Sequence, residues 1–135
     1  MIITPFEQLI AEAEEIQQFL DKGIDVSDNP EIIKETGDKL SSIISRTGNM
    51  LADAKYHLNE MMKDETMKII EDTLLEAKLS AKVQNSLIDS ICKFERLLVD
   101  KIEQLNKTAK YQIEWCRSRL SMAKEELNNT RGWNK

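Results

Sequence analysis

Hydrophobic residues in the first segment recur at intervals of three and four, the spacing of an amphipathic helix. They are Phe6, Leu9, Ala13, Ile16 and Leu20. Thr4 is a favoured N-cap residue, Pro5 suits the first helical position, and Glu7 completes a capping box. Gly23 is a typical C-terminal stop. The pattern predicts a first helix between Pro5 and Gly23.

A heptad pattern follows, with Pro30 at the predicted helix start and Asp28 or Asn29 as its cap. Gly37 and Gly48 lie inside this helix and cost roughly 1 kcal/mol each relative to alanine. The small residues of the seam would let a partner helix approach closely. The seam consists of Ile33, Gly37, Leu40, Ile44, Thr47, Leu51, Ala54, Leu58 and Met61.

A third segment is predicted after a break near Lys63–Glu65. It runs from about Glu65 to Leu79, with a pause near Ser80, and its predicted buried residues are Met67, Ile70, Leu74 and Ala77.

The sequence from Ala81 to Asn128 contains no Gly or Pro, and its hydrophobic period changes to eleven residues. Such a period keeps one face of a nearly straight helix on a partner. A helix of this length would reach roughly 70 Å, which exceeds the diameter of a compact domain of this size. The helix would therefore protrude, be interrupted or pair with another copy, and protrusion with pairing is favoured. Three series carry the period: Leu87, Leu98, Ala109 and Leu120; Ile91, Ile102 and Ile113; Phe94, Leu105, Cys116 and Leu127.

The composition agrees with helices throughout, because 32% of the 135 residues are charged while only 4 are Gly and 2 are Pro. We predict a single all-α domain of three to four helices, forming an elongated bundle with coiled-coil-like packing and a long C-terminal helix. Residues 1–63 would form an N-terminal helical hairpin, residues 64–128 the third segment and the long helix, and residues 129–135 a flexible tail, with Gly132 ending any helix.

The location expected from the sequence is the cytoplasm. No apolar stretch is long enough to span a membrane, and the N-terminus lacks the basic region of a signal peptide. Cys92 and Cys116 lie too far apart on one helix for a disulfide and show no metal-ligand spacing. Two reduced thiols suit a reducing compartment.

Charge is divided unevenly along the chain. Residues 1–100 carry 11 basic and 20 acidic side chains, whereas residues 101–135 carry 8 basic and 4 acidic ones. The basic C-terminal third could face phosphates, or it could face the acidic remainder of the same or another copy, which needs no ligand.

The long helix carries a second, aromatic stripe opposite its core face. On a helical wheel Ala109, Ile113, Cys116 and Leu120 form the core face, while Tyr111, Trp115 and Met122 point the other way. We expect that stripe to bind a partner or ligand. The candidate binding residues are Lys107, Lys110, Tyr111, Trp115, Arg117, Arg119 and Met122. Packing against another helix is favoured over stacking of a nucleotide-type ligand.

The only histidine, His57, shares a helix side with Asp53 and Glu60 and is expected on a solvated face. One acidic pattern suggests an alternative, enzymatic function. Glu12-x-x-Glu15 and Glu35-x-x-Asp38 resemble the carboxylates of MazG-like all-α nucleotide pyrophosphohydrolases. That resemblance would make Glu12, Glu15, Glu35 and Asp38 the ligands of Mg²⁺.

The C-terminal half resembles small helical proteins encoded by phages and prophages. The matching elements are Gln84, Cys92-Lys93-Phe94-Glu95, Leu98-Val99-Asp100, Leu105-Asn106-Lys107-Thr108, Gln112, Arg117-Ser118-Arg119-Leu120-Ser121 and Lys124-Glu125-Glu126. The resemblance implies a phage context in a host cell and no particular chemistry. Tyr111 stands where that pattern commonly has His.

Taken together, the sequence predicts a non-catalytic, self-associating interaction protein without a cofactor. Its partner would be another copy or a host protein, and inhibition of a host defence component is one role that the phage context implies. A nucleotide-type ligand and the Mg²⁺-dependent pyrophosphohydrolase are the alternatives. The basic patch is too short to favour nucleic acid.

Overall fold

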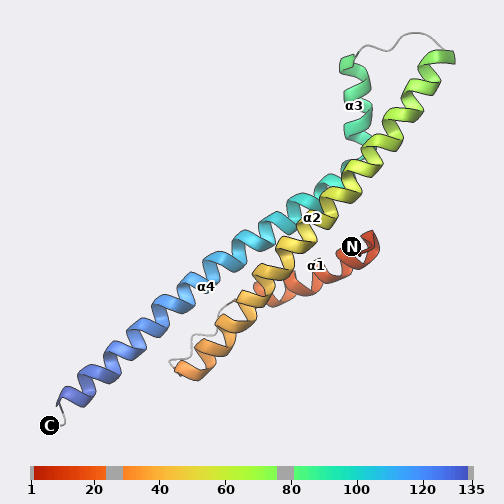
Figure 1. Cartoon of the computed structure of the whole chain (residues 1–135). Helices are drawn as coiled ribbons and strands as arrows, with labels where there is room; N and C mark the ends of the chain where they lie inside the picture. The colour runs from red at the N-terminus through yellow and green to blue at the C-terminus, as the bar shows by residue number, and fades with distance from the viewer. Residues whose placement is uncertain (1, 24–28, 76–80, 134–135) are drawn as a thin grey trace.

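The computed structural model describes residues 2–23, 29–75 and 81–133. These residues form four helices and no strand: α1 (Phe6–Asp21), α2 (Pro30–Leu75), α3 (Ala81–Ile91) and α4 (Lys93–Trp133) (Figure 1). The all-α fold with a long C-terminal helix is therefore confirmed.

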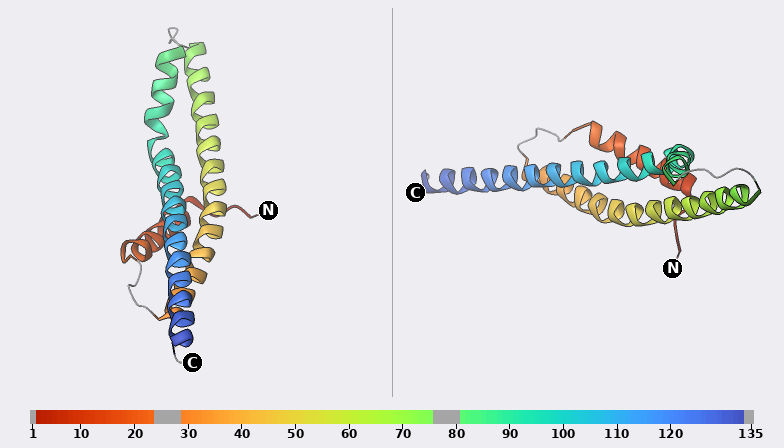
Figure 2. Two further views of the ribbon diagram at one scale, coloured as in Figure 1. Left: turned by 90° about the vertical axis from the view of Figure 1, so that its left-hand side faces the viewer. Right: turned by 90° about the horizontal axis from the view of Figure 1, so that it is seen from above.

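The two long helices, α2 and α4, run antiparallel and form a staggered hairpin (Figures 1 and 2). α1 lies against the first half of α2 and against α4. The C-terminal part of α4 extends past the start of α2, and the second half of α2 extends past the start of α4, where α3 lies beside it. At 1.5 Å per residue the 46 residues of α2 reach about 69 Å, so the molecule is elongated.

The main core lies where α1, α2 and α4 meet. Leu40, Met50 and Ile102 are completely buried there, and the eleven-residue pattern correctly predicts the buried residues between Leu98 and Cys116. The heptad seam of α2 is largely correct but too narrow, because Ile43 and Met50 are buried as well. α2 contacts both α4 and α1, so it buries a wider face than a two-helix seam.

The start of α1 differs from the predicted capping box. The helix begins at Phe6, Pro5 occupies the N-cap position, and no side chain caps it. Thr4 bonds to α2 instead: its N–H donates to Asp53 Oδ2 (3.2 Å), its hydroxyl accepts from Arg46 Nη2 (3.4 Å), and its carbonyl lies 2.7 Å from His57 Nε2. His57 is accordingly half-buried against Phe6, with the ring centroids 6.0 Å apart, rather than on a solvated face.

The end of α1 and the start of α2, on the two sides of the first loop, carry the predicted capping residues. Gly23 has a φ of +72°, the left-handed conformation in which a glycine ends a helix. Asn29 accepts a hydrogen bond through its Oδ1 from the N–H of Glu31 (3.0 Å) at the start of α2.

The predicted break near Lys63–Glu65 is wrong, because α2 continues without interruption to Leu75. The proposed division between residues 63 and 64 therefore falls inside a helix. Met67 is 53% exposed, and Ile69, which was not among the predicted residues, is buried. The side chains of Ile70 and Leu74, together with Ala77 and Ser80, lie outside the described residues.

The helical segment predicted from Ala81 to Asn128 is interrupted at Cys92, which forms a turn between α3 and α4; an interruption is one of the alternatives that its length leaves open. Cys92 is buried against Ile69 in a small second cluster. α4 continues to Trp133, so Gly132 does not end it and the expected flexible tail is helical up to that residue. Cys92 and Cys116 are not joined by a disulfide.

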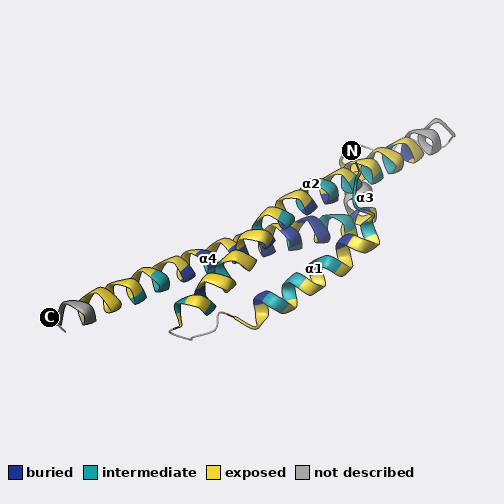
Figure 3. Ribbon diagram, turned by 60° about the horizontal axis from the view of Figure 1, so that its bottom comes forward, coloured by how far each residue is buried: buried dark blue, intermediate teal, exposed yellow. Residues whose placement is uncertain are grey.

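The ends of the eleven-residue pattern are not buried as expected. Phe94, Leu127, Ile91 and Leu87 are 73%, 52%, 45% and 40% exposed. Leu87 and Ile91 lie on α3, before the turn at Cys92, and Leu127 lies in the part of α4 that extends past the start of α2, which is mostly exposed (Figure 3). No helix in the described part of the chain combines the length and hydrophobicity of a membrane span.

Candidate functional site

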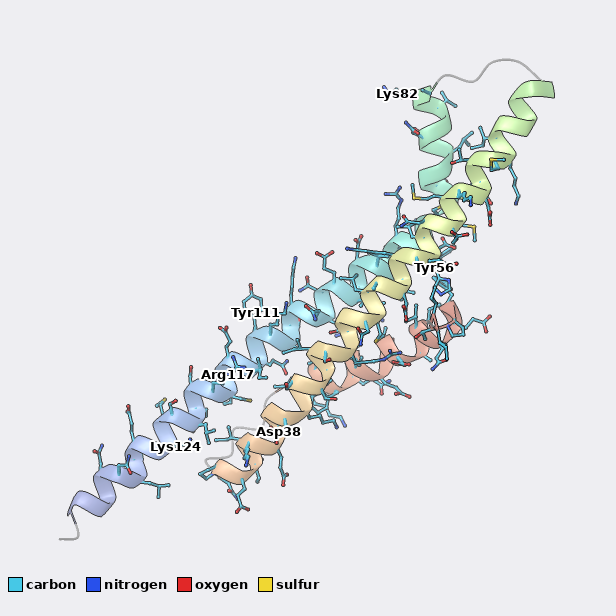
Figure 4. All side chains as sticks on the ribbon, in the orientation of Figure 1. Asp38, Tyr56, Lys82, Tyr111, Arg117 and Lys124 are labelled. Atoms are coloured by element: carbon cyan, nitrogen blue, oxygen red, sulfur yellow. The ribbon has the colours of Figure 1, made fainter. Side chains whose placement is uncertain are left out.

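The predicted aromatic stripe lies on the side of α4 that faces away from α2, with α1 beside only its first residues. We call this stripe the outer face of α4. Its large side chains are well exposed: Tyr111 75%, Leu97 53%, Met122 50% and Trp115 37%, and Figure 4 shows Tyr111 projecting away from α2. The outer face consists of Leu97, Lys101, Gln104, Thr108, Tyr111, Trp115, Ser118 and Met122.

The opposite side of the same helix is core, as predicted. Ala109, Ile113 and Cys116 are buried and Leu120 is half-buried. Burial raises the pKa of the Cys116 thiol, which keeps it protonated and unreactive near neutral pH. The helix therefore has one buried and one exposed apolar side.

The candidate cations are distributed over three places rather than gathered in one. Lys107 and Lys110 line a surface hollow of about 250 Å³ with Tyr111 and Glu114. Lys107 also lies 3.7 Å from a carboxylate oxygen of Glu103. Two of the four side chains around this hollow are therefore lysines, but a carboxylate shares the space with them.

Arg119 and Arg117 lie elsewhere. The guanidinium carbon of Arg119 lies 6.0 Å from the ring centroid of Trp115, a cation–π distance. Arg117 lines a separate hollow of about 230 Å³ between α4 and the start of α2, together with Asp38 and Gly37. A Cβ at Gly37 would meet nothing within 4 Å, so the close helix approach expected at this glycine is wrong.

A further cation of α4 already forms an ion pair within the same chain. Lys101, at the edge of the outer face, pairs with Glu14 of α1 at 3.1 Å. The basic C-terminal third thus already neutralises part of the acidic remainder within one chain.

The four carboxylates of the enzymatic alternative do not form a metal site. Both carboxylate oxygens of Glu12 accept hydrogen bonds from Arg46, at 2.7 and 2.8 Å, which lowers the pKa of Glu12 and raises that of Arg46. Glu15, Glu35 and Asp38 are exposed. No cluster of three or more metal-ligating side chains occurs among the residues that the structure describes.

A second apolar surface was not predicted. Phe94 and Leu97 of α4 line a hollow of about 400 Å³ with Phe6 and Ile10 of α1. Ile10 lies off the hydrophobic stripe of its helix, and the eleven-residue pattern assigned Phe94 to the core. Leu97 joins this hollow to the outer face, and its helical-wheel position on the same side as Tyr111 and Trp115 is the signal in the sequence that could have indicated it.

The fold and this surface define an elongated all-α protein that carries an aromatic and basic face on a long helix. Comparison with protein-family models, with curated proteins and with solved structures finds no match. The function must therefore be inferred from the geometry of the surface itself.

Proposed function

We propose that the chain is a non-catalytic helical interaction protein whose binding surface is the outer face of α4. The observation that supports this most strongly is the exposure of Tyr111, Trp115 and Met122 on a helix that already buries its other side. Surfaces rich in Tyr, Trp, Met and Arg are typical of protein interfaces. Contiguous exposed apolar residues of this kind mark sites of association.

A protein partner fits the surface better than a nucleotide does. A nucleotide site needs cations that converge on phosphates, whereas here Glu114 lines the same hollow as Lys107 and Lys110 and Arg117 lies in another hollow. A helix or loop of a protein can meet such a mixed surface with charges of both signs. Leu97 and Met122, at the two ends of the outer face, offer apolar contacts that a nucleotide would not reach.

The enzymatic alternative has no comparable support. Its Mg²⁺ ligands would have to include Glu12, whose two carboxylate oxygens are engaged by Arg46. In the phage context that the sequence resemblance implies, the partner would be another copy or a host protein, and inhibiting a host defence component would be one consequence of binding.

The test replaces Tyr111 of the full-length chain with a photo-crosslinking amino acid, p-benzoylphenylalanine. The cells that produce this variant are then irradiated. The matched control carries the same group at Tyr56, which is 45% exposed on α2. We expect irradiation to give a covalent protein adduct of defined mass from position 111 but not from position 56. We also expect Trp115→Ser to reduce that adduct. An absence of any protein adduct from position 111 would contradict the proposed function.

A further inference from the structure

We infer that the outer face of α4 binds the same face of a second copy of the chain, with the two helices antiparallel. This inference rests on the proposed function, because it names the partner of the surface proposed there.

The spacing of the outer face is that of a coiled-coil seam. Its eight residues are separated alternately by four and three positions from Leu97 to Met122, an average of 3.5 residues per turn. The buried side of α4 follows an eleven-residue period instead. The stripe spans 26 residues, or about 38 Å of helix, and six of its eight residues are exposed in a single chain, the exceptions being the half-buried Lys101 and Thr108.

The spacing of the eight positions of the outer face is symmetric about a midpoint between Ala109 and Lys110. An antiparallel second copy centred there places Leu97 opposite Met122 of the second copy, and Thr108 opposite its Tyr111. Gln104 then faces Trp115, and Lys101 faces Ser118. Each contact occurs twice, as in a twofold-symmetric interface. The two terminal apolar residues of the stripe thereby meet each other.

A parallel pairing in register is disfavoured by charge. It would place Lys101 opposite Lys101 of the second copy in the seam, and like charges in contact destabilise such a pair. The antiparallel arrangement places Lys101 opposite a serine.

The flanking charges specify the same arrangement. One flank of the outer face is occupied by α1, since Gln112 donates to the Leu20 carbonyl (3.1 Å) and Lys101 pairs with Glu14. The open flank carries Lys107 and Glu114, both exposed. In the antiparallel register Lys107 lies opposite Glu114 of the second copy, and Glu114 lies opposite its Lys107. Charged flanking pairs of this kind set partner choice and orientation in coiled coils.

The experiment exploits this reciprocal pair. Sedimentation equilibrium of the full-length protein at low ionic strength, where exposed charges are least screened, should show a monomer–dimer equilibrium. Lys107→Glu places two carboxylates opposite each other, and Glu114→Lys places two ammonium groups opposite each other. Each single variant should dimerise about tenfold more weakly than the wild type. An equimolar mixture of the two variants should regain wild-type affinity, because every pair is then of opposite charge.

The matched control is Lys124→Glu, which makes the same charge change at an exposed residue of α4 outside the stripe and its open flank. We expect it to dimerise like the wild type. A wild-type chain that stays monomeric at several hundred micromolar, or a mixture that associates no better than its separate components, overturns the inference. Neither result overturns the proposed function, which fails only if position 111 gives no protein adduct.

Discussion

Three side chains of α2 hold the N-terminal segment in place. Asp53 accepts from the Thr4 N–H and His57 bonds to the Thr4 carbonyl, while Arg46 donates two hydrogen bonds to Glu12 of α1. The Arg46–Glu12 pair is partly shielded, with side-chain exposures of 37% and 25%. Both of its hydrogen bonds are charge-assisted and they form a bidentate pair, the geometry in which an ion pair contributes measurably.

We predict that Glu12→Gln lowers the free energy of unfolding by about 0.5–1 kcal/mol at pH 7. The pKa of Glu12 is depressed by its hydrogen bonds to Arg46, from an ordinary value of 4.5. A depressed carboxyl pKa stabilises the fold above pH 4.5, and this contribution is lost as the pH falls through the lower folded value. The difference between the two proteins should therefore disappear in acid.

Urea unfolding at pH 7 and at pH 3, followed by circular dichroism, measures this difference. Glu15→Gln, at an exposed carboxylate of the same helix, is the control and should be neutral at both pH values. An equal effect of Glu12→Gln at both pH values would show that the pair does not act through the carboxylate charge.

At the scale of the helices, a polar contact between α2 and α4 stands out within the apolar core. Thr47 is completely buried; its hydroxyl donates to the Ile43 carbonyl (2.8 Å) and accepts from Asn106 Nδ2 (2.9 Å). The same amide also reaches the Ile44 carbonyl at 3.1 Å. Sliding one helix along the other would break both hydrogen bonds of the Asn106 amide, which are costly to lose beside a buried core. This contact therefore favours the observed register of the long hairpin.

We predict that Thr47→Val and Asn106→Ala each lower the free energy of unfolding by about 1–2 kcal/mol. The double variant should lose less than the sum of the two, by about 0.5–1 kcal/mol, since both changes remove the same hydrogen bond. Urea unfolding of the four proteins gives this coupling. Ser45→Ala, at an exposed position of α2, serves as control, and strictly additive losses would argue against a shared contact.

The helices show which buried positions the local hydrophobic pattern can predict and which it cannot. The core face of α4 between Leu98 and Cys116 is predicted correctly, because the same period repeats over several turns that all face the same partners. The exposure of Leu127 follows instead from the stagger of the hairpin, which no local pattern encodes. Likewise, nothing near Thr4 indicates that residues some 50 positions away bind its backbone.

The candidate site follows the same rule. The helical wheel places Tyr111, Trp115 and Met122 on one exposed face, because that depends on α4 alone. It does not place Arg117 beside Asp38 in a separate hollow, because that depends on where α2 begins. The sequence around the turn at Cys92 contains no Gly or Pro that would predict it.

For the molecule as a whole, the stagger leaves the end of α4 exposed beyond the start of α2. Residues 121–129 are exposed apart from the half-buried Ala123 (Figure 3). A helix without tertiary contacts is marginal in water and opens at low free-energy cost. In dilute, monomeric protein we predict amide hydrogen exchange in residues 121–129 at least about a hundredfold faster than in residues 98–116, measured by mass spectrometry of peptic fragments.

If copies pair through the outer face, Met122 lies opposite Leu97 of the second copy. Protection around residue 122 should then rise with protein concentration and be lost again in Lys107→Glu at the same concentration. Protection of residues 121–129 equal to that of residues 98–116 in the dilute protein would mean that the end of α4 is stabilised by something other than a second copy.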